Sequence, residues 1–274
     1  MKAEKDLNSQ QEHLAEINYD LRITNLARFI FKKIRNHFRH PELGSGSIEM
    51  PKPASQRGEQ VRHDVRLKSK LIDVGAGNGL FLKFFKNREF EVTGIELEAE
   101  LVAKMKKDPQ LKGVAISQGD ITKLTGKGQY GVAIASDVIE HIKDDKKALE
   151  NLWTFLKPGG LLVITVPAHS YLYGKRDVAW GHFRRYDKKS LELKVKSLKF
   201  SEVKIITFWN IVGYFVYFFY EKMLHKQINE EMRYGKSFKS KIVRTVLDFI
   251  LKVEEMIGGL PLGLTLVAVV KKIK

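Results

Sequence analysis

The chain has 274 residues, enough to bury one sizeable core in one or two domains. It has no cysteine, which excludes disulfides, cysteine-ligated zinc and a cysteine nucleophile, and which is typical of a reducing compartment. The formal net charge of +16 favours anionic partners. Because the lysines are scattered and no recognisable nucleic-acid-binding module accompanies them, we interpret the excess as the mark of a lysine-rich proteome or as a solubility trait.

The first sixty residues divide into three stretches. Residues 1–20 are polar and lack the apolar core of a secretory signal, so we expect a cytoplasmic protein, with peripheral membrane contact as the alternative. Residues 21–39 show helical apolar periodicity and hold six basic and no acidic residues. This helix either lies on a membrane or covers its own domain, and we favour the second. Residues 40–60 are rich in proline and glycine and predict a loop.

Residues 70–80 contain the most informative pattern in the chain. Leu71, Ile72 and Val74 form a short apolar strand around one acid, Asp73. Glycines follow at alternate positions, Gly75, Gly77 and Gly79, and an apolar helical stretch begins at Leu80. A strand that runs through a glycine turn into a helix brings backbone N–H groups against a ligand.

The glycine spacing separates two cofactor families. A dinucleotide site needs a small residue at position 80, where this chain has Leu80, and needs no acid inside the strand. The run Asp-x-Gly-x-Gly-x-Gly, from Asp73 to Gly79, resembles motif I of the class I S-adenosylmethionine-dependent methyltransferases.

Further strands follow in the order that this resemblance requires. A second strand ends at Glu96, where an acid can accept both ribose hydroxyls of a nucleoside. Val114–Ser117, Gly131–Ala135 and Leu161–Val166 are the next strands. The resemblance covers about residues 68–209 and the last strand. It implies a doubly wound, seven-stranded, mostly parallel α/β sheet of the Rossmann-like methyltransferase type, with the last strand antiparallel.

The resemblance also implies S-adenosylmethionine as cofactor and S-adenosylhomocysteine as product. Glu96 matches the ribose acid, and Asp120 matches the acid that accepts from the adenine amino group. The cofactor residues that we predict are Asp73, Gly75, Gly77, Asn78, Gly79, Glu96, Leu97, Asp120, Ile121, Ser136 and Asp137.

His141 is the first candidate for a general base, because it follows the carboxyl end of the fourth strand. The pattern Asp137-x-x-Glu140-His141 resembles the metal-binding Glu-x-x-Glu-His of ubiquinone-biosynthesis and small-RNA methyltransferases, with a shorter first acid. We predict an enzyme without a metal. Asp137, Glu140 and His141 are the ligands in the alternative.

The loop after the fifth strand resembles a "Val-Pro-Ala … His-x-Arg-Arg-Tyr" signature found in methyltransferases of glycan, lipid and secondary-metabolite pathways. We predict catalytic roles for His182 and Tyr186 beside His141. We predict acceptor contacts for His169, Tyr173, Trp180, Arg184 and Arg185. In the alternative, an arginine pairs with Asp177 and the aromatic rings fill the loop's own core.

Four segments follow from these patterns. We predict an N-terminal helical cap and linker at 1–60, a cofactor-binding core at 61–209, a helical insertion or lid at 210–258, and the final strand at 259–274. The uncharged aromatic stretch 205–220 is too short to span a bilayer. We expect the aromatic rings at 214–220 to be covered by Ile23, Ile30 and Ile34, above an acceptor pocket.

The predicted reaction is O-methylation of a hydroxyl or carboxylate on a small-molecule, lipid-like or peptide acceptor in a biosynthetic pathway, with nitrogen as the next choice of acceptor atom. Three alternatives stay open: an RNA-modifying enzyme that uses the basic surface, a lipid or glycan methyltransferase at a membrane surface, and a non-catalytic cofactor-binding protein. The sequence does not predict the oligomeric state.

Overall fold

The computed structural model describes residues 21–39, 69–88, 90–224 and 238–274. The predictions made for residues 1–20 and 40–60, and the part of the predicted insertion at 225–237, lie outside this part of the chain.

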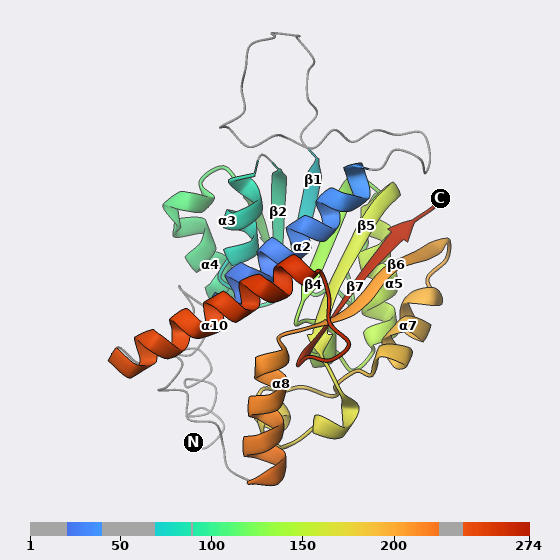
Figure 1. The fold of residues 1–274 in the computed structure, drawn as a ribbon. Coiled ribbons are helices and arrows are strands. Elements are labelled where there is room, and N and C mark those ends of the chain that lie inside the picture. Colours follow the sequence, from blue (N-terminus) through green and yellow to red (C-terminus); the bar gives the residue numbers. More distant parts are fainter. Residues whose placement is uncertain (1–20, 40–68, 89, 225–237) are drawn as a thin grey trace, which may run out of the picture.

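Seven strands form one sheet in the order β3-β2-β1-β4-β5-β7-β6 (Figure 1). Their bounds are β1 (Lys70–Val74), β2 (Glu91–Glu96), β3 (Ala115–Gln118), β4 (Tyr130–Ser136), β5 (Leu156–Pro167), β6 (Ser201–Trp209) and β7 (Thr265–Lys272). β7 is antiparallel to both of its neighbours, and the other pairs are parallel. The doubly wound sheet that the sequence predicts is confirmed.

Helices cover both faces of the sheet. The α-helices are α2 (Leu21–Arg39), α3 (Leu80–Lys86), α4 (Ala99–Lys107), α5 (Asp145–Phe155), α6 (Lys175–Ala179), α7 (Lys188–Lys196), α8 (Ile211–Tyr217) and α10 (Phe238–Ile257). Short turns of 3-10 helix are η3 (Pro109–Leu111), η4 (Ile139–His141) and η5 (Ser170–Leu172), and η6 (Phe218–Met223) is a π-helix that continues α8. None of the helices in the described residues is long and apolar enough to cross a bilayer.

Alternate side chains of the central strands enter two apolar cores, one on each face. Ile72 lies in one core, whereas the preceding Leu71 lies in the other. Both faces are covered, so β4 reads as a continuous apolar run rather than an alternating one. This packing fixes the carboxyl ends of β1, β4 and β5 side by side, where the predicted site residues follow.

Helix α2 covers its own domain. Leu26, Phe29 and Ile30 are buried in the same core as Leu71. α2 also lies beside α10 (Figure 1), and Asn25 Nδ2 donates to Asp248 Oδ1 at 2.9 Å. The helix therefore meets the insertion, as expected.

The expected cover for the rings at 214–220 is wrong. Ile30 and Ile34 are fully buried in the sheet core, so they are not available to the rings of α8 and η6. Phe215 and Phe219 are exposed, and Tyr217 is buried. Tyr217 packs instead on the loop after β5, where its hydroxyl donates to Asp177.

Candidate functional site

Three glycines shape the turn between β1 and α3, and all have positive φ: 75° at Gly75, 55° at Gly77 and 76° at Gly79. A Cβ at Gly75 would lie 2.3 Å from Val138 Cγ2, so this glycine permits close packing. At Gly77, by contrast, no described atom lies within 4 Å of an added Cβ. Gly77 is therefore where a ligand can approach bare backbone.

Glu96 holds this turn from the neighbouring strand. Its Oε2 accepts from the N–H of Gly77 at 2.7 Å, and its Oε1 accepts from the N–H groups of Leu97 at 2.7 Å and Glu98 at 3.1 Å. A carboxylate offers about four acceptor positions, so the residue still has capacity toward a ribose hydroxyl. Leu97 beside it is 60% exposed and offers an apolar surface to a base.

Asp120 lies in the loop after β3. Its Oδ1 accepts from the Thr122 N–H at 2.9 Å and from Thr122 Oγ1 at 2.7 Å. These bonds, with Lys123 near the other oxygen, lower the pKa of Asp120 below its usual range. The group is ionised at neutral pH, as an acceptor from an amino group must be. Ile121 is buried beside it.

The surroundings of Asp73 indicate whether a cationic cofactor fits this site. The residue is 1% exposed, and its Oδ2 has no hydrogen-bond partner among the described residues. Burial, and then the nearby Glu96 carboxylate, raise the pKa of Asp73 to about 7. Two acids this close are costly without a compensating cation. A ligand with an ammonium and a sulfonium group supplies that charge, so Asp73, Glu96 and the opening at Gly77 fit S-adenosylmethionine.

Replacing Asp73 with asparagine is expected to stabilise the protein without cofactor, increasingly as the pH rises. The folded pKa lies above the unfolded value of 3.8. The native state therefore binds the extra proton, and the wild type loses stability from about pH 4 through about pH 7. The variant avoids this loss, which is up to about 4 kcal/mol because one pKa unit is worth about 1.4 kcal/mol. Urea unfolding at pH 5 and pH 8 measures the difference.

The exposed Asp144→Asn serves as the control and should show no such gain in stability with pH. An Asp73→Asn gain that is equal at both pH values would contradict a raised pKa. The variant should also bind S-adenosylhomocysteine more weakly, because its side chain no longer carries a charge for the ligand's amino group.

The ends of β4 and β5 are linked through Thr165. Its Oγ1 lies 2.8 Å from Ser136 Oγ, and its carbonyl accepts from the Asp137 N–H at 3.0 Å. Asp137 has φ of 53°, a left-handed conformation that costs energy in a non-glycine residue. Asn78 lies half-buried between Gly77 and Gly79. The residues predicted to contact the cofactor thus gather at the ends of β1, β2, β3 and β4.

Two histidines meet beside this edge. The His141 and His182 rings lie 4.6 Å apart and nearly perpendicular. His182 Nδ1 lies 2.9 Å from Asp177 Oδ1, a contact that assigns the proton to Nδ1 and the lone pair to Nε2. His141 keeps an exposed edge, but desolvation of its ring, and then His182, lower the pKa of His141 to about 4. His141 is therefore neutral at pH 7 and weakly basic.

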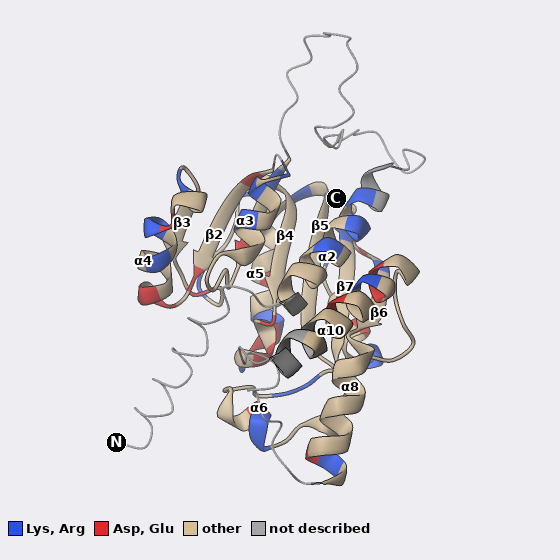
Figure 2. Ribbon diagram, turned by 60° about the vertical axis from the view of Figure 1, so that its left-hand side comes forward, with Lys and Arg blue, Asp and Glu red and all other residues tan. Residues whose placement is uncertain are grey.

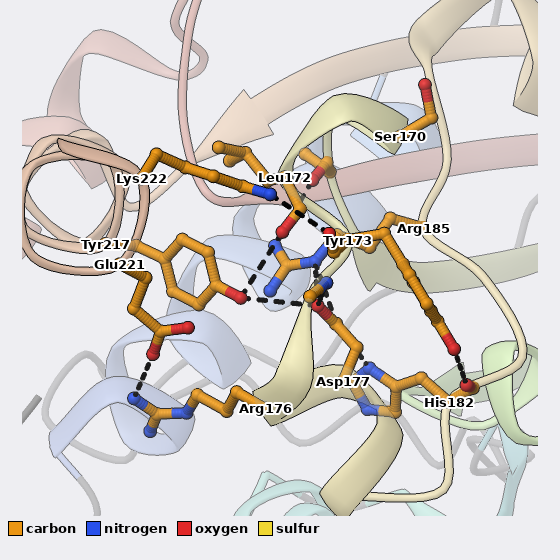
Figure 3. Close-up of polar contacts among 12 residues, drawn as sticks. Ser170, Leu172, Tyr173, Arg176, Asp177, His182, Arg185, Tyr217, Glu221 and Lys222 are labelled. Atoms are coloured by element: carbon orange, nitrogen blue, oxygen red, sulfur yellow. Dashed lines mark hydrogen bonds and ion pairs between the residues drawn. The ribbon is translucent and has the colours of Figure 1, made fainter. Parts of the chain in front are cut away.

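Asp177 is the centre of a buried polar network (Figure 3). Arg185 Nε donates to both carboxylate oxygens, at 2.8 and 2.9 Å, beside the His182 contact. The Tyr217 hydroxyl and the Gly174 N–H donate to Oδ2 at 3.2 and 3.0 Å. Burial opposes ionisation, but the bonds from His182 and Arg185 keep the pKa of Asp177 below its usual value. The carboxylate holds the loop after β5, His182 and α8 together.

The structure gives both predicted anion-binding arginines partners within the protein. Arg185 is buried on Asp177, as in the alternative interpretation of the loop, and its guanidinium lies over the Tyr217 ring at 4.3 Å. Arg184 Nη1 lies 2.8 Å from Asp145 Oδ2, and its Nη2 donates to the Lys143 carbonyl. Both guanidinium groups therefore already pair with acids of the protein itself.

The remaining predicted residues also have structural contacts. Tyr186 is buried and donates to Asp145 at 2.8 Å; burial and this acid raise its pKa, which makes it unsuited to proton transfer at neutral pH. His169 is stacked on Phe208, with its Nε2 2.9 Å from the Gly263 carbonyl. The Tyr173 hydroxyl donates to the His182 carbonyl at 2.8 Å. The Trp180 ring lies edge-on to the His182 ring, with 5.8 Å between the ring centroids.

The donor atoms of Glu140, His141 and His182 lie within 4.8 Å of one another. Asp137, the first residue of the set proposed from the sequence, does not belong to this group, and His182 takes its place. One carboxylate and two imidazoles are donor types that divalent ions accept. The use of a metal stays an open prediction, which activity in the presence of a chelator would test.

Sequence reasoning missed two residues of this site. Asp177 entered only as a partner for an arginine, although it also orients His182. Its position five residues before a histidine and eight before an arginine gave a signal that could have been read. Tyr217 gave none, because nothing in the aromatic stretch distinguishes the ring that turns inward.

Comparisons with known proteins agree with the geometry. A family model described as "Methyltransferase domain" matches residues 35–199, more than half of the chain. The trans-aconitate 2-methyltransferase of Deinococcus radiodurans is 29% identical over 118 residues, which are 42% of this chain and 45% of that protein. The ubiquinone biosynthesis O-methyltransferase of Coxiella burnetii is 29% identical over 124 residues, 43% of this chain and 53% of that protein.

The chain thus spans about half the length of the curated relatives that it matches. Among solved structures, an S-adenosylmethionine-dependent methyltransferase from Mesorhizobium loti aligns with a TM-score of 0.51 at 13% identity. The alignment covers 74% of this chain and 90% of that structure. At this identity the likeness supports the fold.

Proposed function

Because this chain belongs to the methyltransferase-domain family, as the class I resemblance predicts, we propose that it transfers a methyl group from S-adenosylmethionine to an oxygen of a small molecule. The acceptor class extends to lipid-like and peptide compounds. Of the two oxygen types foreseen from the sequence, a hydroxyl is now favoured over a carboxylate. Arg184 and Arg185 are paired within the protein, whereas a histidine oriented by an acid is present.

The Asp177–His182 pair is the observation that carries this proposal. A hydroxyl must lose its proton as its oxygen attacks carbon, so it needs a base. S-adenosylmethionine, when bound, supplies a methyl group already activated by the sulfonium. His182 accepts the hydroxyl proton at Nε2, and Asp177 holds Nδ1–H and stabilises the charged ring. The turn at Gly77 and the acids Asp73 and Glu96 position the cofactor.

Binding of the cofactor tests the first half of the proposal. Titration calorimetry should give heat with S-adenosylhomocysteine and none with NAD. Methyl transfer from labelled S-adenosylmethionine to catechol and to trans-aconitate then compares a phenol with a carboxylate. Transfer to the carboxylate alone would overturn the preference for a hydroxyl, and equal binding of NAD would overturn the cofactor.

The two histidines are expected to differ as bases. His182→Gln should lower the turnover number on a phenol about 100-fold or more, because it removes the oriented proton acceptor. His141→Gln should have a smaller effect, because the lowered pKa makes His141 a weak base. Both variants should bind S-adenosylhomocysteine like the wild type. A larger loss in His141→Gln than in His182→Gln, measured per folded molecule, would reverse the assignment.

A further inference from the structure

Helix α10 carries an apolar stripe that the fold does not bury. Ile242, Val246, Phe249, Val253 and Met256 recur at spacings of four and three, so they lie along one side of the helix. All five are exposed, Phe249 at 67% and Met256 at 76%. The opposite side packs on the domain through Leu247 and Leu251. This stripe is therefore a surface feature and does not form part of the core.

A second stripe lies on the helix that follows β6. Phe215, Phe219 and Met223, four residues apart, are 57%, 49% and 60% exposed. Tyr217 and Glu221 point the other way, toward the loop after β5 (Figure 3). Figure 2 shows charged residues on this helical segment only near the end farthest from α10. Both stripes come from the chain between β6 and β7.

The charges around these stripes are asymmetric. The acids with described side chains are largely turned inward: Glu221 pairs with Arg176, Glu254 accepts from the N–H groups of Asn210 and Ile211, and Asp248 accepts from Asn25. Lys252, whose side chain is 51% exposed, pairs with Asp248 at 2.6 Å. The sequence 233–244, which overlaps the first residues of α10, contains five basic residues and no acid.

We propose that the two apolar stripes, α8–η6 and α10, bind the surface of an anionic lipid bilayer. Exposed apolar side chains together with a basic segment, here 233–244, are what an anionic interface selects, since the apolar groups enter the acyl boundary and the cations meet the headgroups. A second copy of the chain fits less well, because two molecules of net charge +16 repel each other. The inference concerns binding and holds whichever acceptor is methylated.

Flotation of the full chain with vesicles tests the inference. Phosphatidylcholine vesicles should bind little protein, and vesicles with one quarter phosphatidylglycerol should bind at least ten times more, with the excess lost at 0.5 M salt. Phe249→Ser/Met256→Ser and Phe215→Ser/Phe219→Ser should each reduce binding several-fold. Leu193→Ser/Ile273→Ser replaces two equally exposed apolar residues elsewhere and should bind like the wild type.

Thermal unfolding and S-adenosylhomocysteine binding, measured for each variant, check that the fold and the cofactor site are intact. A loss of vesicle binding can then be told apart from a failure of the proposed reaction. Absence of anionic selectivity would overturn the inference. So would equal loss of binding in the control pair. A wild-type dimer in light scattering that the Phe249→Ser/Met256→Ser change turns into a monomer would assign the α10 stripe to a second copy instead.

Discussion

Replacing Asp177 with alanine is expected to lower the free energy of unfolding by about 3–5 kcal/mol, the usual cost of breaking a buried ion pair from one side. Arg185 is 7% exposed, and its Nε donates to both oxygens of this carboxylate. The variant therefore buries a guanidinium without its partner. It also releases His182 and Tyr217, which bond to the same acid. Urea unfolding at pH 7 measures the loss.

A double variant separates the ion pair from packing. Asp177→Ala/Arg185→Met removes both charges and should recover much of the stability, because no charge stays buried alone. Turnover should stay low in the double variant, since His182 has lost the acid that orients it. Glu192→Ala, which breaks only a surface pair with Lys196, should leave the free energy of unfolding nearly unchanged. A stable Asp177→Ala protein would show that the buried pair does not support the fold.

Glu96→Ala is expected to weaken S-adenosylhomocysteine binding by about 100-fold or more. Two charge-assisted hydrogen bonds to the ribose are lost, at a cost of roughly 3 kcal/mol. Affinity should fall further because the Gly77 N–H no longer has its carboxylate acceptor, so the glycine turn is no longer held in place. Calorimetry with the purified ligand measures the change.

Glu91→Ala is the matched control, since it removes an acid from the start of the same strand. Glu91 pairs with Lys70 at 3.3 Å in an exposed position far from the glycine turn. Its loss should leave the affinity for S-adenosylhomocysteine unchanged. Equal affinities of Glu96→Ala and the wild type would refute the placement of the ribose at this acid.

The sheet was predictable because its signals are local. β1 and β4 are short apolar runs, and the sequence from Asp73 to Gly79 indicates a strand end, a turn and a helix start in one stretch. Boundaries were less accurate. β5 begins at Leu156, before the predicted Leu161, because Leu156 pairs with Tyr130 ahead of a shift in register that the sequence does not announce.

The sequence predicted which residues lie at the site better than it predicted which of them contact one another. Residues at strand ends, such as Glu96, follow from position alone. The role of Arg185 depends on Asp177, which lies in another part of the same loop and meets it only in three dimensions. The burial of Tyr217 and the exposure of Phe215 could not be predicted either, because aromatic residues occur on both sides of this helical stretch. Tertiary contacts decided both.

The position of β7 has a consequence for how the chain folds. β7 is the last of the seven strands to be synthesised, yet it lies between β5 and β6 and pairs with both. Until it arrives, two apolar strands have open edges, which are the surfaces most prone to pair with other chains. The contacts that close the sheet are also distant in sequence, which slows their formation. This half of the sheet is therefore where the nascent protein depends most on protection from aggregation.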